Sequence, residues 1–315
     1  MLSEVPHIFQ SVSDDSDTLN WLFFWFFIAS GIVLLSVAGL ITYIVKKFGA
    51  KERKKDIPQK HYHDNRAAEL IVIGVSSVIV LLFLFLSVKI MWQIQSPIPE
   101  GKDPDLIVTG HQWWWEVSYP GTDVVAANEI HIPAGERLLL RLESADVIHN
   151  WWVPALGRKM DMIPGITNHV WIQAREPGTY EGMCSEFCGA QHAWMRMQVV
   201  AHEPDEFKAW QNEQSQSMKN SNDALVQEGA QLFKEKTCAT CHTVKGWSEK
   251  ATIGPDLTHV GSRYKILGGK EINSVEALKR WIDNPQDVKP GVHMPNFLMT
   301  EKEVNAIATW LYSLK

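Results

Sequence analysis

The 315-residue chain lacks an excess of positive charge and has very little cysteine. Its 30 Lys and Arg residues are outnumbered by 36 Asp and Glu residues, which gives a net charge of −6 and argues against nucleic acid as a partner. No internal repeat is visible. The four cysteines form two close pairs, 184/188 and 238/241. Disulfides are the default interpretation in an oxidising compartment, so the spacing and surroundings of each pair have to be weighed separately.

Charged residues are also missing from two long apolar runs, 21–45 and 70–88. Runs of this kind predict membrane-spanning helices, because about 20 residues cross the hydrocarbon core of a bilayer. The segment between them, KKFGAKERKKDIPQKHYHDNR, holds eight Lys or Arg, whereas the residues before the first run hold none. The positive-inside rule therefore predicts a cytoplasmic loop, with both termini and everything after Trp92 on the outer, periplasmic side of a bacterial inner membrane.

The rest of the chain divides by pattern. Residues 105–200 carry short runs rich in β-branched and aromatic residues, separated by Pro-Gly and Ala-Gly pairs, which predict an antiparallel sandwich or barrel. The polar stretch NEQSQSMKNSND at 212–223 predicts a flexible linker. The pattern then becomes helical, with Val275, Leu278 and Ile282 on one face and a capping box formed by Thr300 and Glu303.

We therefore expect a multidomain chain. Its parts are an external segment 1–19, a two-helix transmembrane hairpin 20–94, an all-β domain 95–205, a linker 206–222 and an all-α domain 223–315.

The α domain contains CATCH, in which Cys238, Cys241 and His242 have the spacing of a haem c attachment site. Two thiols at this spacing reach the two vinyl groups of one haem, and the adjacent histidine is held under the iron. A redox dithiol is the main alternative, but it requires a strand–helix context. Met294 is the expected second axial ligand, because it is a soft ligand on a loop before the final helix. Met299 and His293 compete for that role.

The α domain resembles class I cytochrome c. The shared features are an N-terminal helix, CxxCH, a Gly-Pro-Asp-Leu stretch beginning at Gly254, a Met-Pro loop and a C-terminal helix. In that family the proline after Gly254 lies near the proximal histidine, here His242.

The second Cys pair lies in CSEFCGAQHAWM, which permits a disulfide, a zinc site or a copper site. Structural zinc sites space their cysteines about two to four residues apart and end in Cys or His. A nearby thioether, Met195, favours a metal that accepts sulfur ligands of this kind, which indicates copper. Two thiolates can bridge two coppers, each of which then requires one imidazole. His192 supplies one, and the other has to come from elsewhere in the chain.

Three segments carry a specific resemblance: GHQWWW at 110–115, SADVIHNWWVPALGRKMDMIPG and CSEFCGAQHAWM. Together they resemble subunit II of cytochrome c oxidase over residues 20–200, in the variant whose subunit II carries its own cytochrome c. The resemblance implies a cupredoxin-like Greek-key barrel with a binuclear copper centre, CuA. Its implied ligands are His149, Cys184, Cys188, His192, Met195 and the backbone carbonyl of Glu186.

The same resemblance implies three further roles. The Glu186 carboxylate helps hold a magnesium ion at the contact with subunit I. Trp113 is the residue through which electrons enter the copper centre. Glu69 lies at the entrance of a proton pathway in subunit I. Two departures from the family pattern are Trp114, where tyrosine is usual, and the missing aromatic residue after Glu69.

The implied function is electron entry into a proton-translocating terminal oxidase. Electrons pass from a donor through haem c and CuA to the haem-copper subunit I, which reduces oxygen to water. Expected partners are subunits I and III, and either cytochrome c or a quinol-oxidising complex, in a supercomplex with the latter. The alternative is a CuA-bearing subunit of a nitric oxide reductase. A nitrous oxide reductase, a copper-free quinol-oxidase subunit and a copper-delivery protein are disfavoured.

Overall fold

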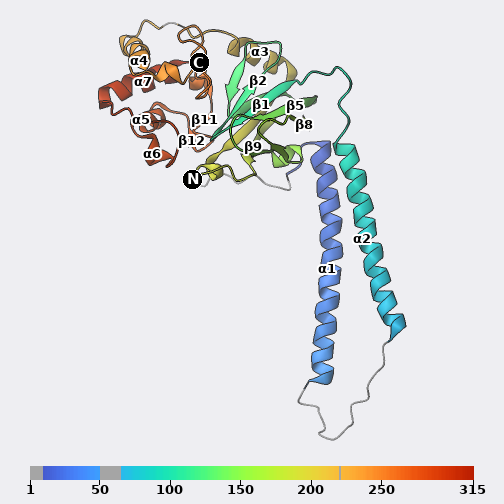
Figure 1. Cartoon of the computed structure of the whole chain (residues 1–315). Helices are drawn as coiled ribbons and strands as arrows, with labels where there is room; N and C mark the ends of the chain where they lie inside the picture. The colour runs from blue at the N-terminus through green and yellow to red at the C-terminus, as the bar shows by residue number, and fades with distance from the viewer. Residues whose placement is uncertain (1–9, 50–64, 220) are drawn as a thin grey trace. The chain divides into compact units, whose positions relative to one another are not determined.

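The computed structural model describes residues 10–49, 65–219 and 221–315, in two compact units. The first unit, 17–96, contains all but the first residues of helix α1 (Asp14–Phe48) and the whole of α2 (Arg66–Ile94), and the two helices run side by side in Figure 1. Both are long and apolar enough to cross a membrane, and their apolar side chains are exposed. The two helices expected from the apolar runs are thus present. Most of the loop expected to be cytoplasmic, 50–64, lies outside the described residues.

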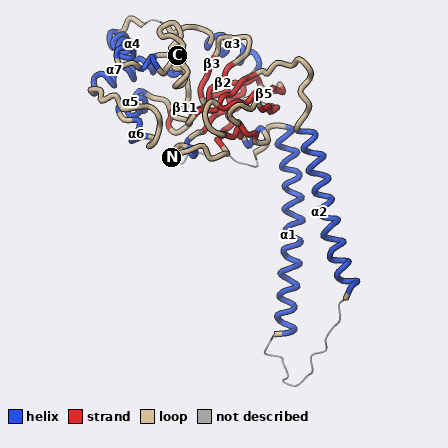
Figure 2. The backbone as a smooth tube through the Cα atoms, viewed as in Figure 1, coloured by secondary structure: helices blue, strands red, loops and turns tan. Residues whose placement is uncertain are grey.

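The second unit, 10–16 with 97–315, contains a β domain and a helical domain (Figure 2). The β domain has two five-stranded sheets, with orders β3-β2-β1-β5-β8 and β4-β10-β9-β6-β7. The strands are β1 (Leu106–His111), β2 (Trp114–Ser118), β3 (Val125–Ala127), β4 (Glu129–Pro133), β5 (Arg137–Ser144), β6 (His149–Trp152), β7 (Met160–Met162), β8 (Asn168–Gln173), β9 (Gly178–Cys184) and β10 (Arg196–His202).

Strand pairing corrects one expectation about this domain. The pairs β1–β5 and β4–β10 are parallel, so the sandwich is mixed rather than purely antiparallel. Alternate residues of β1 are buried, as a strand with one face on a core requires. The core between the sheets includes Trp115, Trp151 and Leu140, all with almost no exposure. Two short 3-10 helices, Pro154–Leu156 and His192–Trp194, lie in the connections.

Helix α3 (Pro204–Gln214) occupies the first part of the segment expected to be a linker. Pro204 begins the helix, where its missing N–H is tolerated. Phe207 and Trp210 pack against the core of the β domain, and both rings contact Tyr119. The linker prediction is therefore wrong for residues 206–214, because two apolar side chains anchor this otherwise polar stretch.

The helical domain consists of α4 (Ala224–Glu235), α5 (Val275–Asp283), α6 (Pro285–Val288) and α7 (Glu301–Ser313), with the short strands β11 (Lys265–Ile266) and β12 (Glu271–Ile272). Helices α4 and α7 pack at Gly229, where a Cβ atom would lie 2.1 Å from the carbonyl oxygen of Ala306. The capping box of Thr300 and Glu303 is present, which confirms that prediction. Leu278 and Ile282 of α5 are buried in the core of this domain.

Candidate copper and haem sites

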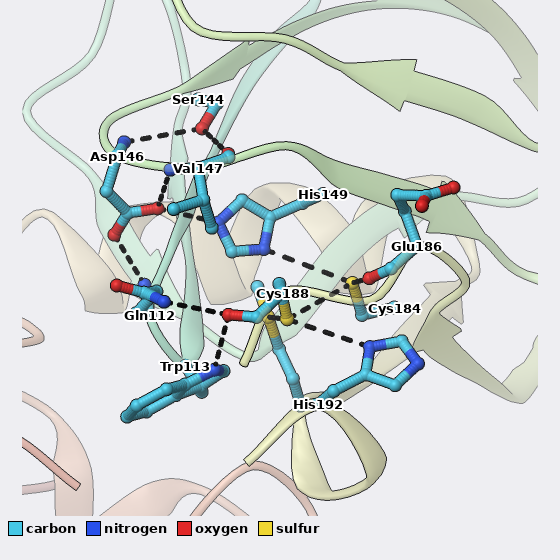
Figure 3. Close-up of polar contacts among 11 residues, drawn as sticks. Gln112, Trp113, Ser144, Asp146, Val147, His149, Cys184, Glu186, Cys188 and His192 are labelled. Atoms are coloured by element: carbon cyan, nitrogen blue, oxygen red, sulfur yellow. Dashed lines mark hydrogen bonds and ion pairs between the residues drawn. The ribbon is translucent and has the colours of Figure 1, made fainter. Parts of the chain in front are cut away.

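The first group of candidate ligands forms where strands β6 and β9 pair. His149 opens β6 and Cys184 closes β9, and the antiparallel register places Trp151 opposite Cys184. The Nδ1 atom of His149 consequently lies 3.9 Å from the Cys184 sulfur (Figure 3). Both side chains are buried. The sheet register thus unites two residues that are far apart in the sequence.

The loop after β9 supplies the remaining candidates. The Cys188 sulfur lies 3.8 Å from the Cys184 sulfur, 3.6 Å from Nδ1 of His192 and 3.7 Å from the Met195 sulfur. The carbonyl oxygen of Glu186 lies 3.2 Å from the Cys184 sulfur, whereas its exposed carboxylate points away from the thiols in Figure 3. A backbone hydrogen bond from Cys184 N to Met195 O closes the loop. The structure therefore gathers all six expected ligand positions.

The two thiols are free, so the disulfide interpretation does not describe this structure. A hydrogen bond with the Cys188 thiol, assisted by one with His149, lowers the pKa of Cys184 to about 3 despite burial. The hydrogen bond to Cys184 and burial together raise the pKa of Cys188. Without metal, the pair thus carries one negative charge. A bound cation would favour loss of the second proton, because metal binding requires thiolates.

Asp146 supports His149 and was not identified from the sequence. Its carboxylate lies 2.8 Å from Nε2 of His149 and accepts hydrogen bonds from the backbone N–H groups of Val147 and Gln112 (Figure 3). Burial alone lowers the pKa of His149, but hydrogen bonds with Cys184 and Asp146 raise it overall. Asp146 thereby fixes the imidazole with Nδ1 toward the thiols. Its position three residues before the histidine was the available sequence signal.

Gly110 also positions His149. A Cβ atom at Gly110 would lie 2.9 Å from Cδ2 of the imidazole, closer than side chains normally approach. The ring therefore packs directly against the backbone of β1. Gly110 opens the GHQWWW segment, but the sequence alone does not reveal what its missing side chain accommodates.

Trp113 lies beside the copper-ligand candidates. Its side chain is 8% exposed, and its indole N–H donates to the carbonyl oxygen of Cys188 at 3.0 Å. The side-chain amide of Gln112 donates to the same oxygen at 2.8 Å (Figure 3). The indole also contacts the helical domain, since its ring centroid lies 4.9 Å from that of His293. Trp114 instead stacks on His111, at 4.2 Å.

An apolar pocket in the helical domain contains the second group of candidates. Cys238, Cys241, His242 and Met294 all line it, together with Trp113 from the β domain. Nδ1 of His242 lies 2.8 Å from the carbonyl oxygen of Pro255, which confirms the expected proximity of that proline. Burial lowers the pKa of His242, so the imidazole is neutral and has Nε2 available for a metal.

The backbone of Gly254 packs directly against the imidazole of His242. A Cβ atom there would lie 2.5 Å from Cε1 of the imidazole. The ring is thus confined between the Gly254 backbone and the pocket, and the hydrogen bond to Pro255 fixes its rotation. The pocket is large and apolar and has two thiols and an imidazole on its wall, which suits a haem attached through CATCH.

The three candidates for the second axial position differ in their surroundings. Met294, Met299 and His293 all line the pocket. Met299 packs against the core of the helical domain, and the exposed His293 contacts Trp113. Met294 belongs to neither arrangement. Glu69 lies in the first turn of α2, exposed, in the other compact unit, so the structure does not unite it with these candidates.

Comparison with known proteins gives consistent results for both domains. Residues 124–202 match the family model for the periplasmic domain of cytochrome c oxidase subunit II, and residues 226–315 match that for cytochrome c. The solved periplasmic domain of cytochrome oxidase subunit II from Bradyrhizobium japonicum is 31% identical. It covers 36% of this chain and 95% of its own, with a TM-score of 0.35.

Several curated relatives carry the name cytochrome c oxidase subunit 2. That of Bacillus subtilis is 32% identical over 66% of this chain and 61% of its own length. That of Alkalihalophilus pseudofirmus is 37% identical over 91% of this chain and 84% of its own length. Because this similarity spans the apolar helices, the β domain and the haem-type domain, the chain belongs to the cytochrome c oxidase subunit 2 family.

Proposed function

We propose that the chain accepts electrons at its helical domain and passes them through a two-copper centre to the haem-copper subunit I of a proton-pumping oxidase. The observation that carries this proposal is the arrangement of the two imidazoles, each of which approaches a different thiol. Oxygen is the proposed final acceptor rather than nitric oxide, because the named relatives are cytochrome c oxidase subunits.

The donor positions fit two copper ions better than one zinc ion. A single tetrahedral ion requires four donors that converge on one point. Within the described residues, the donor atoms of His149, Cys184 and Cys188 lie within 4.8 Å of one another, but Nδ1 of His192 does not join that group. The Met195 thioether, fully buried beside Cys188, also favours copper. We therefore propose that the thiolates of Cys184 and Cys188 would hold both copper ions.

When bound, a thiolate-bridged copper pair exchanges one electron with little change in geometry. The protein maintains that geometry: Asp146 holds His149 in place, and the hydrogen bond from Cys184 N to Met195 O closes the ligand loop. Burial of both thiols excludes water from the pair. The indole of Trp113 donates a hydrogen bond to the Cys188 carbonyl oxygen and also contacts the ring of His293, which supports its proposed role in electron entry.

The pocket residues fit a covalently attached haem c, a one-electron carrier. Cys238 and Cys241 would form the thioethers, and His242 and Met294 would be the axial ligands. Met294 is preferred over Met299 because the partly buried Met299 already packs against the core. The partly buried Arg263 also lines the pocket, and its guanidinium would offset the negative charge of haem propionates.

Further assignments follow from family membership. Subunits I and III are the proposed partners, in the inner membrane, with both soluble domains on the periplasmic side. The exposed Glu186 carboxylate is the proposed magnesium ligand at the contact with subunit I, and Glu69 the proposed entrance of a proton pathway. The donor is cytochrome c or a quinol-oxidising complex, which can form a supercomplex with the oxidase.

Electron paramagnetic resonance of the purified oxidase tests the central assignment. The expected spectrum shows hyperfine splitting from two equivalent copper nuclei, and it disappears in Cys188→Ser. The matched variant Cys241→Ser should alter haem attachment and leave this copper signal intact. A spectrum from one copper nucleus, or zinc in metal analysis of this subunit, would overturn the two-copper assignment. Consumption of nitric oxide without oxygen uptake would instead support the alternative reductase.

A further inference from the structure

A buried carboxylate of the β domain holds the helical domain. Glu129 begins the edge strand β4 and is 6% exposed. Its Oε1 atom accepts hydrogen bonds from the backbone N–H groups of Tyr264 at 2.8 Å and Lys265 at 3.0 Å. A buried carboxylate is unfavourable unless it is well hydrogen-bonded. The helical domain supplies both of these donors. The Oε1 atom of Glu129 therefore accepts these hydrogen bonds only when the two domains are in contact in this arrangement.

A pair of histidines lies behind Glu129. Its second carboxylate oxygen is 3.8 Å from Nε2 of His131. The Nδ1 atom of His131 lies 2.7 Å from Nε2 of His202 on the neighbouring strand. Trp210 of α3 stacks on the His131 ring at a centroid distance of 4.1 Å. These contacts restrict the Glu129 side chain from within its own domain, so that it presents Oε1 to the helical domain.

Lys265 of the helical domain makes a further contact with the β domain. Its ammonium lies 2.6 Å from a carboxylate oxygen of Glu181 on β9. The buried side-chain amide of Gln198 donates to the same oxygen at 2.6 Å. Lys265 is therefore held through its backbone N–H and through its side chain, by two different strands of one sheet. This double attachment fixes both the position and the rotation of β11.

A second contact joins the loop that carries Met294 to the copper-ligand loop. Lys289, 4% exposed, donates to the carbonyl oxygens of Leu267 at 3.2 Å and Trp194 at 3.4 Å. Trp194 directly precedes the ligand candidate Met195. A Cβ atom on Gly268 would lie 2.4 Å from the Trp194 carbonyl oxygen, so the two backbones touch here. The second contact thus lies beside the ligand loops of both proposed centres.

We propose that Glu129 is a positioning residue that latches the helical domain onto the β domain. Electrons then pass between the two proposed centres in a standing complex, without a docking step. Residues 215–223 connect α3 to α4. Ser215, Gln216 and Met218 are hydrogen-bonded to the helical domain in this arrangement. Released from these contacts, a flexible chain of this length would span roughly 15–18 Å, enough for the helical domain to leave Trp113. This inference rests on the proposed electron-transfer function and adds that the transfer is not limited by domain motion.

The test uses the complete oxidase, with photoreduction of its haem c and measurement of copper reduction at increasing glycerol concentrations. In the unmodified enzyme the internal rate should not depend on viscosity. In Glu129→Ala it should fall at least tenfold and become inversely proportional to viscosity, while the spectra of both centres stay unchanged. Glu129→Gln keeps an acceptor oxygen for both N–H groups and should restore the rate to within twofold. Glu136→Ala, at an exposed glutamate of the same domain, is the matched control.

The outcomes distinguish a failure of the proposed latch from a failure of the proposed electron-transfer function. An unchanged, viscosity-independent rate in Glu129→Ala would overturn the latch. If Glu129→Ala does not assemble, Glu129→Asp, which withdraws the carboxylate by one methylene, is judged by the same two criteria. Failure of copper reduction in the unmodified enzyme would instead contradict the proposed function itself.

Discussion

Replacing Gly254 by alanine should displace the proposed haem ligand His242. The new Cβ atom would lie 2.5 Å from Cε1, 2.8 Å from Nδ1 and 3.0 Å from Nε2 of the imidazole. Carbon atoms pack at about 3.5–4.0 Å, so the ring has to move by roughly 1 Å. It cannot simply rotate, because Nδ1 is hydrogen-bonded to the Pro255 carbonyl at 2.8 Å. The variant should therefore perturb both the ligand and the stability of the domain.

The energy of this overpacking can be bounded. Added methyl groups in well-packed interiors destabilise by about 1–3 kcal/mol, and loss of the Pro255 hydrogen bond adds about 1 kcal/mol. A loss of about 2 kcal/mol lowers the thermal midpoint of a domain of this size by roughly 8–16 °C. The expected result is a lower thermal midpoint for the haem signal and a loss of low-spin haem in the optical spectrum.

Gly229→Ala provides the matched control. Its Cβ atom would lie 2.1 Å from the Ala306 carbonyl oxygen, a more severe clash in the same domain but between helices α4 and α7. It should lower the thermal midpoint at least as much, while the folded protein keeps its low-spin spectrum. If Gly254→Ala has the same thermal midpoint and the same haem absorption spectrum as the unmodified protein, the reasoning about His242 is wrong. The same holds if both variants change the haem spectrum equally.

Three further predictions concern other parts of the chain. Asp146→Asn removes the charge that supports His149 and should weaken copper binding about 10–100-fold in competition with a chelator; unchanged affinity would exclude this support. Met294→Leu should convert the haem to a high-spin or substituted form, whereas an unaltered spectrum would transfer the ligand role to another residue. The hydrogen bond from Lys236 lowers the pKa of Glu303 to about 2, from 4.5. This stabilisation is present above about pH 4.5 and is lost as pH falls toward 2, so an acid titration of Glu303→Gln should lack that component.

The sequence allows prediction of those parts of the sites that depend on local spacing. Cys184, Cys188, His192 and Met195 lie within one short loop, and CATCH is contiguous, so their residue types and separations indicate metal and haem chemistry directly. Helix α7 was equally predictable, because its capping box and apolar period are local features.

The remaining features depend on contacts between distant segments. His149 meets Cys184 only through the register of β6 and β9. Gly110 and Gly254 leave room for the imidazoles of His149 and His242, which are not their neighbours in the sequence. The sequence predicts a linker where helix α3 lies, because two apolar residues in a polar stretch give a weak pattern. A single sequence contains no record of such neighbours, so these features required the three-dimensional structure.

The buried polar groups at the contact between the two domains have a physical reason. Because the domains are linked by a short connection, the effective concentration of one at the other is already of millimolar order. The interface therefore does not have to provide much affinity, but it has to select one orientation. Apolar surfaces tolerate sliding, whereas a buried carboxylate such as Glu129 or a buried ammonium such as Lys289 is satisfied in only one register. Such groups add little net stability, and they hold the loops of both proposed centres in a fixed relation.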